Sequence, residues 1–282
     1  MQIGIDLSHK QICGVLICKN LVLATVTTSI YCFKRDSKKE IMDKMIGLID
    51  SLFTSEVKAI GVSLPTTTNP ERGVIYDVHK IPHWKNIRLK TILEEKFRVP
   101  TYVNGDVNCF ILGEKCYGTC KCYKDLISIT IDTSIGTSAI INNKLYSDTC
   151  SCFTQATCLS EACFQCVRQY NDTYMRTLEE LLYLYSTYNP DLDFANHELW
   201  KAIGAIVGRL AVIMLTNFNA QAIVLGGELA TSYEYCVDAI KDYVNVFKPS
   251  YVTAEKYIIP SEVKDVRAVG ATYIASGGRA SA

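Results

Sequence analysis

Asp106 stands where a carboxylate could do acid–base chemistry. It follows an apolar run, Val99 to Val103, that predicts a short strand, and then the turn signal Asn104-Gly105. A helical pattern begins at Val107. Ligands of α/β proteins bind outside the carboxyl ends of strands, where an aspartate can take a proton from a substrate hydroxyl. The alternative is a helix N-cap, and the local sequence by itself favours it because aspartate is a preferred capping residue.

Three further segments could face a nucleotide. The turns Asp6–Lys10 and Asp132–Ser138 each lie between two predicted strands, and tight turns rich in amides and hydroxyls form anion-binding nests. The third segment, Ile223–Leu229, joins a buried strand to a helix through Gly226-Gly227. Glycine there would let a flat ring or a phosphate approach the backbone. Taken singly, each segment is more simply interpreted as an ordinary turn.

Hydrophobic periodicity predicts the elements that must position these residues. An opening hairpin occurs twice: Ile3–Ser8 and Ile129–Ser134 each precede a strand, a tight turn and a strand, and each carries an aspartate followed two residues later by a serine. Helical spacing and short apolar runs predict the other elements. The expected helices are Ser37–Thr54, Leu89–Phe97, Leu159–Tyr170, Leu178–Tyr188, Trp200–Phe218 and Glu234–Val246, and the expected strands are Val57–Leu64, Val99–Val103 and Ala222–Leu225.

Alternation of strands and helices after each hairpin predicts an α/β protein of two domains that face one another. We expect an N-terminal domain over residues 1–115, with the first turn and Asp106. A C-terminal domain over residues 116–275 would hold the second turn and the glycine pair, and residues 276–282 would form a polar tail.

The charge balance and the apolar stretches exclude several classes of protein. Lysine and arginine number 29, as do aspartate and glutamate, so there is no broad basic field for nucleic acid or an anionic membrane. The N-terminus lacks the charged-then-apolar pattern of a signal peptide. In the apolar stretch Ala202–Phe218, Arg209 would cost about 3 kcal/mol on membrane insertion, which favours a buried helix. We expect a cytoplasmic protein with neither nucleic acid nor a membrane as its partner.

Several stretches, taken together and in order, resemble the ROK family of sugar kinases and sugar-responsive repressors. That family lies within the superfamily of actin, hexokinase and heat-shock-chaperone ATPases, and the resemblance runs from about Ile3 to Ala275. It is carried by Ile5-Asp6, Gly61-Val-Ser-Leu-Pro65, Asn69-Pro-Glu-Arg-Gly73, Ile81-Pro-His-Trp84, Val103–Asn108, Leu112-Gly-Glu114, Cys158–Glu161, Ile223–Gly227 and Val269-Gly-Ala271.

The resemblance implies a fold and an activity. The fold would be two ribonuclease-H-like α/β domains, of the actin and hexokinase type, with a cleft between them. The activity would be glucokinase-like transfer of a phosphoryl group from ATP to a sugar hydroxyl, with Mg²⁺, in a homodimer. The alternative is a catalytically inactive member that binds a small ligand or regulates a partner, without a DNA-binding domain, since no helix-turn-helix precedes the first strand.

The resemblance also implies residue roles. Asp106 would be the catalytic base. The expected nucleotide and metal contacts are Asp6 for Mg²⁺, Ser8, Thr133, Ser134 and Gly136 for the phosphates, and Gly226 and Gly227 for the adenosine. The expected acceptor contacts are Thr66, Lys80, Gly105 and Asn108.

The chain departs from the family pattern at these same sites. Ser8-His9-Lys10 replaces the glycine-rich first phosphate loop, and Asp132 brings a carboxylate into the second. Lys80 and Gly105 stand where the family has asparagines, and a loop with a sugar-binding Glu and His is missing before Cys150. A sugar site without several hydrogen-bonding groups should bind that sugar weakly or select another ligand.

A zinc site is a further implication of the resemblance. The family holds zinc with three cysteines and the His of the missing loop, and this chain keeps Cys150, Cys152 and Cys158. A closed tetrahedral site needs a fourth ligand, which another cysteine of this chain could supply. The alternative is that these cysteines are small apolar residues without a metal.

Overall fold

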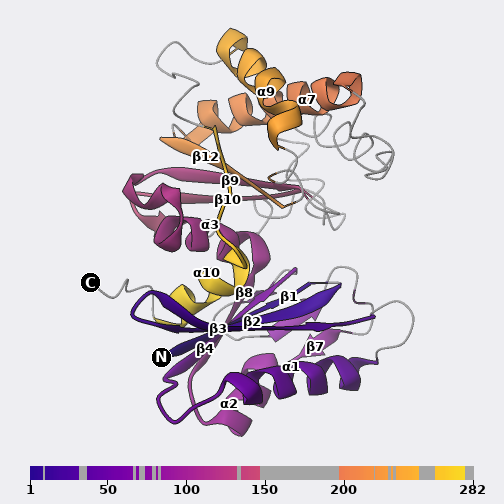
Figure 1. The fold of residues 1–282 in the computed structure, drawn as a ribbon, viewed down its shortest axis with the longest axis vertical. Helices are drawn as coiled ribbons and strands as arrows, with labels where there is room; N and C mark the ends of the chain where they lie inside the picture. Colours follow the sequence, from indigo (N-terminus) through magenta and orange to yellow (C-terminus); the bar gives the residue numbers. More distant parts are fainter. Residues whose placement is uncertain are drawn as a thin grey trace. The chain divides into compact units, whose positions relative to one another are not determined.

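The chain folds into two compact units in the computed structural model (Figure 1). The first comprises Met1–Cys122 and Val263–Ala282, and the second Tyr123–Glu262. The boundary thus lies after Cys122 instead of after residue 115, and the segment from Val263 returns to the first unit. The structure describes residues 1–8, 10–31, 37–65, 68–69, 74–77, 81, 84–131, 135–146, 197–218, 220–227, 230, 233–247 and 258–276.

A mixed five-stranded sheet forms the centre of the first unit, with the strand order β3-β2-β1-β4-β8. Its strands are β1 (Gln2–Leu7), β2 (Gln11–Cys18), β3 (Leu21–Ser29), β4 (Ala59–Leu64) and β8 (Thr101–Gly105). The first three pair antiparallel, whereas β1, β4 and β8 run parallel. A small second sheet joins β5 (Thr68–Asn69), β6 (Val74–Asp77) and β7 (Lys85–Ile87).

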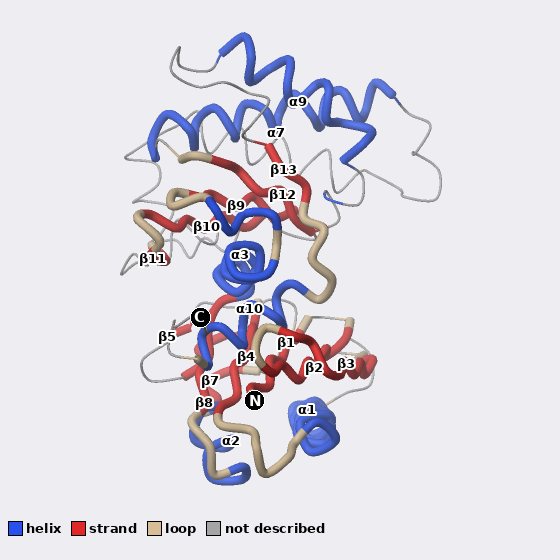
Figure 2. The backbone as a smooth tube through the Cα atoms, turned by 60° about the vertical axis from the view of Figure 1, so that its left-hand side comes forward, coloured by secondary structure: helices blue, strands red, loops and turns tan. Residues whose placement is uncertain are grey.

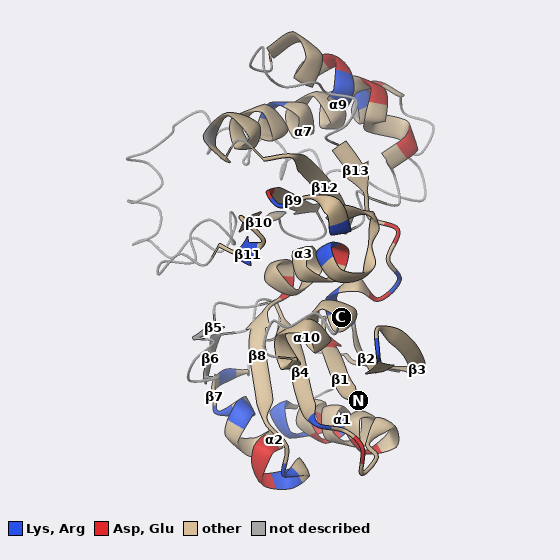
Figure 3. Cartoon of the chain, turned by 90° about the vertical axis from the view of Figure 1, so that its left-hand side faces the viewer, with Lys and Arg blue, Asp and Glu red and all other residues tan. Residues whose placement is uncertain are grey.

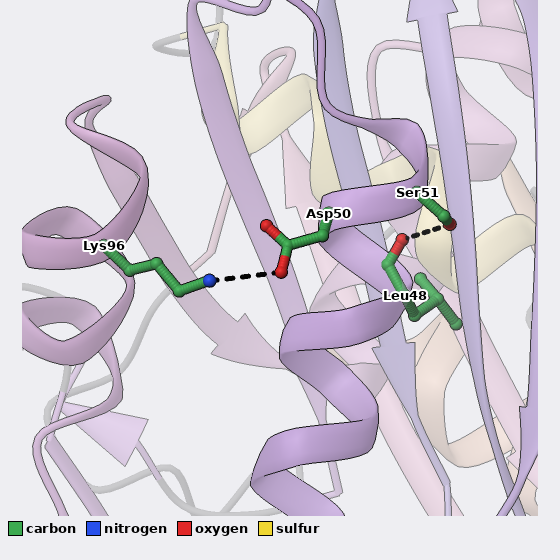
Figure 4. Close-up of polar contacts among 4 residues, drawn as sticks. All are labelled: Leu48, Asp50, Ser51 and Lys96. Atoms are coloured by element: carbon green, nitrogen blue, oxygen red, sulfur yellow. Dashed lines mark hydrogen bonds and ion pairs between the residues drawn. The ribbon is translucent and has the colours of Figure 1, made fainter.

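Helices α1 (Lys38–Leu52) and α2 (Leu89–Phe97) cover one face of the large sheet. Helix α1 begins at Ser37, whose hydroxyl accepts from the amide of Glu40 while the Glu40 carboxylate accepts from the amide of Ser37, a capping box that satisfies two exposed donors. The Nζ of Lys96 on α2 lies 3.1 Å from Oδ2 of Asp50 on α1 (Figure 4). Both helices confirm the elements expected there.

Helix α10 (Val266–Ala275) packs on the opposite face, where the strands carry glycine. A Cβ at Gly4 of β1 would collide with the carbonyl oxygen of Ala268, and a Cβ at Gly61 of β4 with that of Ala271. Bare backbone on two neighbouring strands therefore lets the helix lie directly on the sheet. This packing explains why the segment from Val263 belongs to the first unit.

Helix α3 (Asp106–Tyr117), followed by the short 3-10 helix η1 (Thr119–Cys122), packs against α10 in the same manner. A Cβ at Gly113 would meet the carbonyl oxygen of Val266, and a Cβ at Gly270 would meet that of Cys109. The two helices approach so closely that their backbones are in contact at both points.

The second unit repeats the sheet of the first, with the order β11-β10-β9-β12-β13 (red strands in Figure 2). Its strands are β9 (Leu126–Ile131), β10 (Ile135–Ile141), β11 (Lys144–Leu145), β12 (Ala222–Gly227) and β13 (Ile258–Pro260). Strands β9, β10 and β11 pair antiparallel, and β9, β12 and β13 run parallel. Both sheets thus share one order and one set of directions, which confirms the hairpin repeat.

Two long helices, α7 (His197–Phe218) and α9 (Tyr233–Phe247), pack on the second sheet and enclose its core. Gly204 and Gly208 lie on the side of α7 that meets α9, where a Cβ would meet Cys236 and Tyr243 respectively. Both helices agree with the elements expected there. The other two expected helices, Leu159–Tyr170 and Leu178–Tyr188, lie outside the described residues.

Charged residues recur along the helices α1, α2 and α9 (Figure 3). Within the part of the chain that the structure describes, no helix is both long and apolar enough to cross a membrane.

Seven of the described cysteines are free thiols, and four of them (Cys13, Cys109, Cys120 and Cys236) are buried. Burial, followed by the charge of the Asp265 carboxylate, raises the pKa of Cys13 from the ordinary value of 9.0 to about 12. A thiol held protonated in this way is neither a nucleophile nor a metal ligand. These cysteines therefore belong to the core.

We predict that Gly61→Ala destabilises the protein by about 1–3 kcal/mol or more, the usual cost of overpacking, because the new methyl group would collide with the Ala271 carbonyl of α10. The control is Gly47→Ala, at an exposed position of α1 with nothing within 4 Å of a new Cβ; it should stabilise by up to about 1 kcal/mol. Urea unfolding measures both. Equal free energies of unfolding for Gly61→Ala and the wild type would contradict the packing of α10.

The buried thiol predicts a loss of stability in alkali. Below pH 9.0 the Cys13 thiol keeps its proton in both the folded and the unfolded chain, so its contribution to the free energy of unfolding is fully present. As the pH rises toward about 12, only the folded chain keeps the proton, and the free energy of unfolding falls by up to about 1.4 kcal/mol per pH unit. The stability gap between the wild type and Cys13→Ala should therefore narrow between about pH 8 and about pH 10.5 in urea unfolding with a reductant. A constant gap would contradict the assignment.

Candidate active site

The parallel strands of the first unit bring several polar residues to one edge of the sheet. Asp6 pairs in register with Ser63, and Ser63 pairs with Asn104. These three residues therefore form a row across the carboxyl ends of β1, β4 and β8. Asp106 follows Asn104 by two residues in the chain, so the expected position of its carboxylate at this edge is correct.

Asp106 is the first residue of α3 and not its N-cap. Gly105 occupies the N-cap position with an extended backbone (φ −65°, ψ 146°) and contributes no side chain. The Asp106 Oδ1 atom accepts from the amide of Val107 at 2.9 Å, and a carboxylate in the first turn of a helix is favoured by the helix dipole. Asp106 is therefore not the helix N-cap, although the local sequence favoured that interpretation.

An asparagine pair fixes the turn in which Asp106 stands. Asn104 Oδ1 accepts from the amide of Gly105 at 2.8 Å and from Nδ2 of Asn108 at 3.0 Å. Asn104 is almost completely buried, so these bonds replace water for its side chain. Asn104 thus holds Gly105 and Asn108, two of the expected acceptor contacts. The sequence pattern indicated Asn104 only as part of a turn.

The Asp6 carboxylate is held from within the sheet. The hydroxyl of Ser63, a fully buried residue, donates to Asp6 Oδ1 at 2.6 Å, a short bond of the strong, charge-assisted kind. Sequence patterns did not single out Ser63, although a signal exists: it is the one polar side chain in the buried strand β4.

The charges of both carboxylates act on one buried thiol, that of Cys109. Burial raises the pKa of Cys109, a hydrogen bond with Ser63 lowers it, and the charges of Asp6 and Asp106 raise it. Both aspartates therefore act on the same buried atom, together with the guanidinium of Arg267 on α10, which lowers this pKa. Asp6 and Asp106 thus lie at the same edge of the first sheet, an arrangement that spacing along the sequence could not show.

Ser8 closes the turn between β1 and β2. Its Oγ accepts from the amides of Lys10 (3.3 Å) and Gln11 (3.1 Å) and donates to the carbonyl oxygen of Gln11 (3.1 Å). The amide of Ser8 also donates to this carbonyl oxygen, at 2.9 Å. The hydroxyl expected to contact a phosphate is therefore engaged with the backbone of its own turn.

The glycines of the second unit lie at the corresponding edge of its own sheet. Gly226 and Gly227 end β12 and pair with Thr130 and Ile131, the last residues of β9. Gly227 has φ 74°, in a region that favours glycine because a Cβ would clash. Thr130 Oγ1 donates to the carbonyl oxygen of Gly136 at 3.3 Å. Gly136, Gly226 and Gly227 therefore share one end of this sheet.

The remaining expected residues fall outside the described part of the chain. They are Thr66, Lys80, Thr133, Ser134, Cys150, Cys152 and Cys158. Among the residues that the structure does describe, no group of three or more His, Cys, Asp or Glu side chains could hold a metal ion, and the zinc site stays a prediction.

Known proteins similar to this chain include both kinases and repressors. A glucokinase of Thermotoga maritima is 20% identical over 96% of each chain. A xylose repressor of Bacillus spizizenii is 28% identical over 51% of this chain, and the match spans only 38% of the repressor's own length. The structure of a ROK family glucokinase from Streptomyces griseus, in complex with glucose and AMPPNP, superimposes with a TM-score of 0.72 at 18% identity, over 98% of this chain and 99% of the other.

The fold is therefore the two-unit α/β fold of the actin and hexokinase type, as expected. The sequence profile of the ROK family matches residues 2–277, almost the whole of the 282 residues. The chain belongs to the ROK family.

Proposed function

We propose that the protein is an ATP-dependent phosphotransferase that acts on a hydroxyl of a sugar or sugar-like alcohol. The observation that carries this proposal is the placement of Asp106, at the first position of α3 and at the same edge of the first sheet as Asp6. Kinases need little covalent chemistry from the protein, because positioning and electrostatic stabilisation supply most of the catalysis. A rigid edge with two carboxylates suits that requirement.

Asp106 is the general base in this proposal. It takes the proton of the acceptor hydroxyl as that oxygen attacks the terminal phosphoryl group. The Asn104–Asn108 pair fixes the turn that carries Asp106, so the carboxylate is presented from a defined backbone.

Asp6 orients Mg²⁺. Carboxylate oxygens are the ligands that this ion prefers, and it is usually held by one or two of them together with substrate phosphates. Asp6 supplies one such carboxylate at the edge of the first sheet. Bound there, the ion supplies positive charge that offsets the charge of the transferred group. The bond from Ser63 keeps the Asp6 carboxylate in one orientation.

The second unit contributes the nucleotide contacts. Gly226 and Gly227 offer a backbone without side chains at the end of β12, against which the adenosine lies. Gly136, at the same end of the sheet, contributes to the phosphate contacts with Thr133 and Ser134. The structure of the Streptomyces griseus glucokinase is a complex with glucose and AMPPNP, and its similarity to this chain supports ATP and a sugar as the ligands to test first.

A second candidate function is supported by the Ser8 turn. Because Ser8 engages the amides of Lys10 and Gln11, the first phosphate loop is occupied by its own side chain, which favours a member that binds a small ligand without phosphoryl transfer. The match to a xylose repressor agrees with this candidate. Because that relative is a repressor, the match does not support the expectation that the protein has no nucleic-acid partner. That expectation rests on charge balance alone.

We predict that ATP with Mg²⁺ raises the melting temperature of the protein, because a ligand that binds only the folded state stabilises it. A thermal shift series with ATP, ATP and EDTA, and ADP measures this effect. The same samples, incubated with a panel of hexoses, amino sugars and glycosides, should form a phosphorylated sugar detectable by mass spectrometry. No shift with ATP and no transfer to any sugar would reject the kinase proposal in favour of the second candidate.

Asp106→Asn should lower the rate of phosphoryl transfer by about 10²–10⁴-fold, the usual contribution of a general base, while ATP binding and the unfolding midpoint stay close to those of the wild type. The matched control is Asp50→Asn, which removes a carboxylate from an exposed ion pair on α1. That change should leave the rate unaltered, because exposed ion pairs contribute little. A rate for Asp106→Asn equal to that of the control would exclude Asp106 as the base.

A further inference from the structure

We propose that the Ser8 side chain is an internal competitor for phosphate: it occupies the backbone amides of the first phosphate loop and thereby sets how tightly the protein binds a nucleotide. The proposal rests on the proposed function, because it concerns the same nucleotide site. It replaces the simpler expectation that Ser8 contacts the phosphate directly.

The hydrogen bonds of this turn carry the proposal. Two consecutive amides, those of Lys10 and Gln11, donate to the single Oγ atom of Ser8, at 3.3 and 3.1 Å. Consecutive amides that converge on one point form the anion-binding concavity found in phosphate loops. A phosphate oxygen bound in this concavity would accept from the same two donors. The hydroxyl therefore stands where an anion's oxygen would be.

The hydroxyl is in turn fixed in place. It donates to the carbonyl oxygen of Gln11 at 3.1 Å, so its proton points away from the two amides and its oxygen is left to accept from them. All three bonds lie within one turn of the chain, and a partner so close in sequence forms its bonds without bringing distant segments together. A phosphate must displace this partner before it can use the two amides.

The position of the turn connects it to the edge of the sheet that carries Asp6. Ser8 follows β1 directly, two residues after Asp6, and Asp6 is held by Ser63. A phosphate bound at the Ser8 turn would therefore lie at the same edge of the first sheet as the carboxylate that orients Mg²⁺. Glycine at this position has no acceptor, so a loop with glycine in place of Ser8 would keep its amides available.

The experiment removes the hydroxyl and measures two quantities. Ser8→Ala deletes the acceptor, and because Lys10 and Gln11 are exposed, water can bind the released amides and the turn stays folded. Calorimetric titration with AMPPNP and Mg²⁺ should show affinity on the order of tenfold tighter than in the wild type, about 1.4 kcal/mol. Amide hydrogen exchange at Lys10 and Gln11, without nucleotide, should be faster.

Two variants serve as controls. Ser8→Thr keeps a hydroxyl on the same atom, so both its affinity and its exchange rates should remain below those of Ser8→Ala. Ser51→Ala removes a serine hydroxyl that donates within α1, away from the turn, and should bind AMPPNP as the wild type does.

The outcomes separate this proposal from the proposed function. Tighter binding by Ser8→Ala supports the proposal, and if only this variant binds AMPPNP, the wild type is the non-catalytic candidate. A wild type that binds AMPPNP with the same affinity as Ser8→Ala overturns the proposal and leaves the kinase assignment intact. Absence of binding in the wild type and in Ser8→Ala overturns both.

Discussion

The close contact between α10 and the first sheet is the constraint on which the candidate site depends. Gly4 and Gly61 bring the backbone of the helix against β1 and β4. Two residues after each glycine, the same strands carry Asp6 and Ser63, which bond to each other. Any side chain at either glycine would push the helix away and disturb the strand ends. The acidic edge is therefore rigid because the sheet behind it has no side chains at the helix contacts.

The same helix also fixes the start of α3. Gly113 and Gly270 bring α3 and α10 into backbone contact. The charges of Asp6 and Asp106 raise the pKa of the Cys109 thiol on α3. Asp106, three residues before Cys109, is thus presented by a helix that cannot slide along its neighbour. Charge positioned by packed backbone, instead of by a mobile loop, needs no reorganisation when a substrate binds.

Sequence patterns predicted the repeated sheets and most helices, because those elements follow from local periodicity. They also placed Asp106 at the end of a strand, but the local sequence favoured Asp106 as the helix N-cap. The N-cap is Gly105 instead. The bond from Ser63 to Asp6 joins residues distant in the chain, so no local pattern contains it. Ser8 was expected to contact a phosphate, and the structure adds that its hydroxyl bonds to the backbone of its own turn, a geometry that residue type does not predict.

The return of α10 also sets the order in which the protein can assemble. The ribosome makes β1 early and α10 only after the entire second unit. The face of the first sheet that carries Gly4 and Gly61 therefore stays uncovered through most of translation. Domains commonly fold as they emerge, and contacts between distant parts of a chain form slowly. The second unit can therefore fold first, while the first unit, although it begins the chain, is completed last.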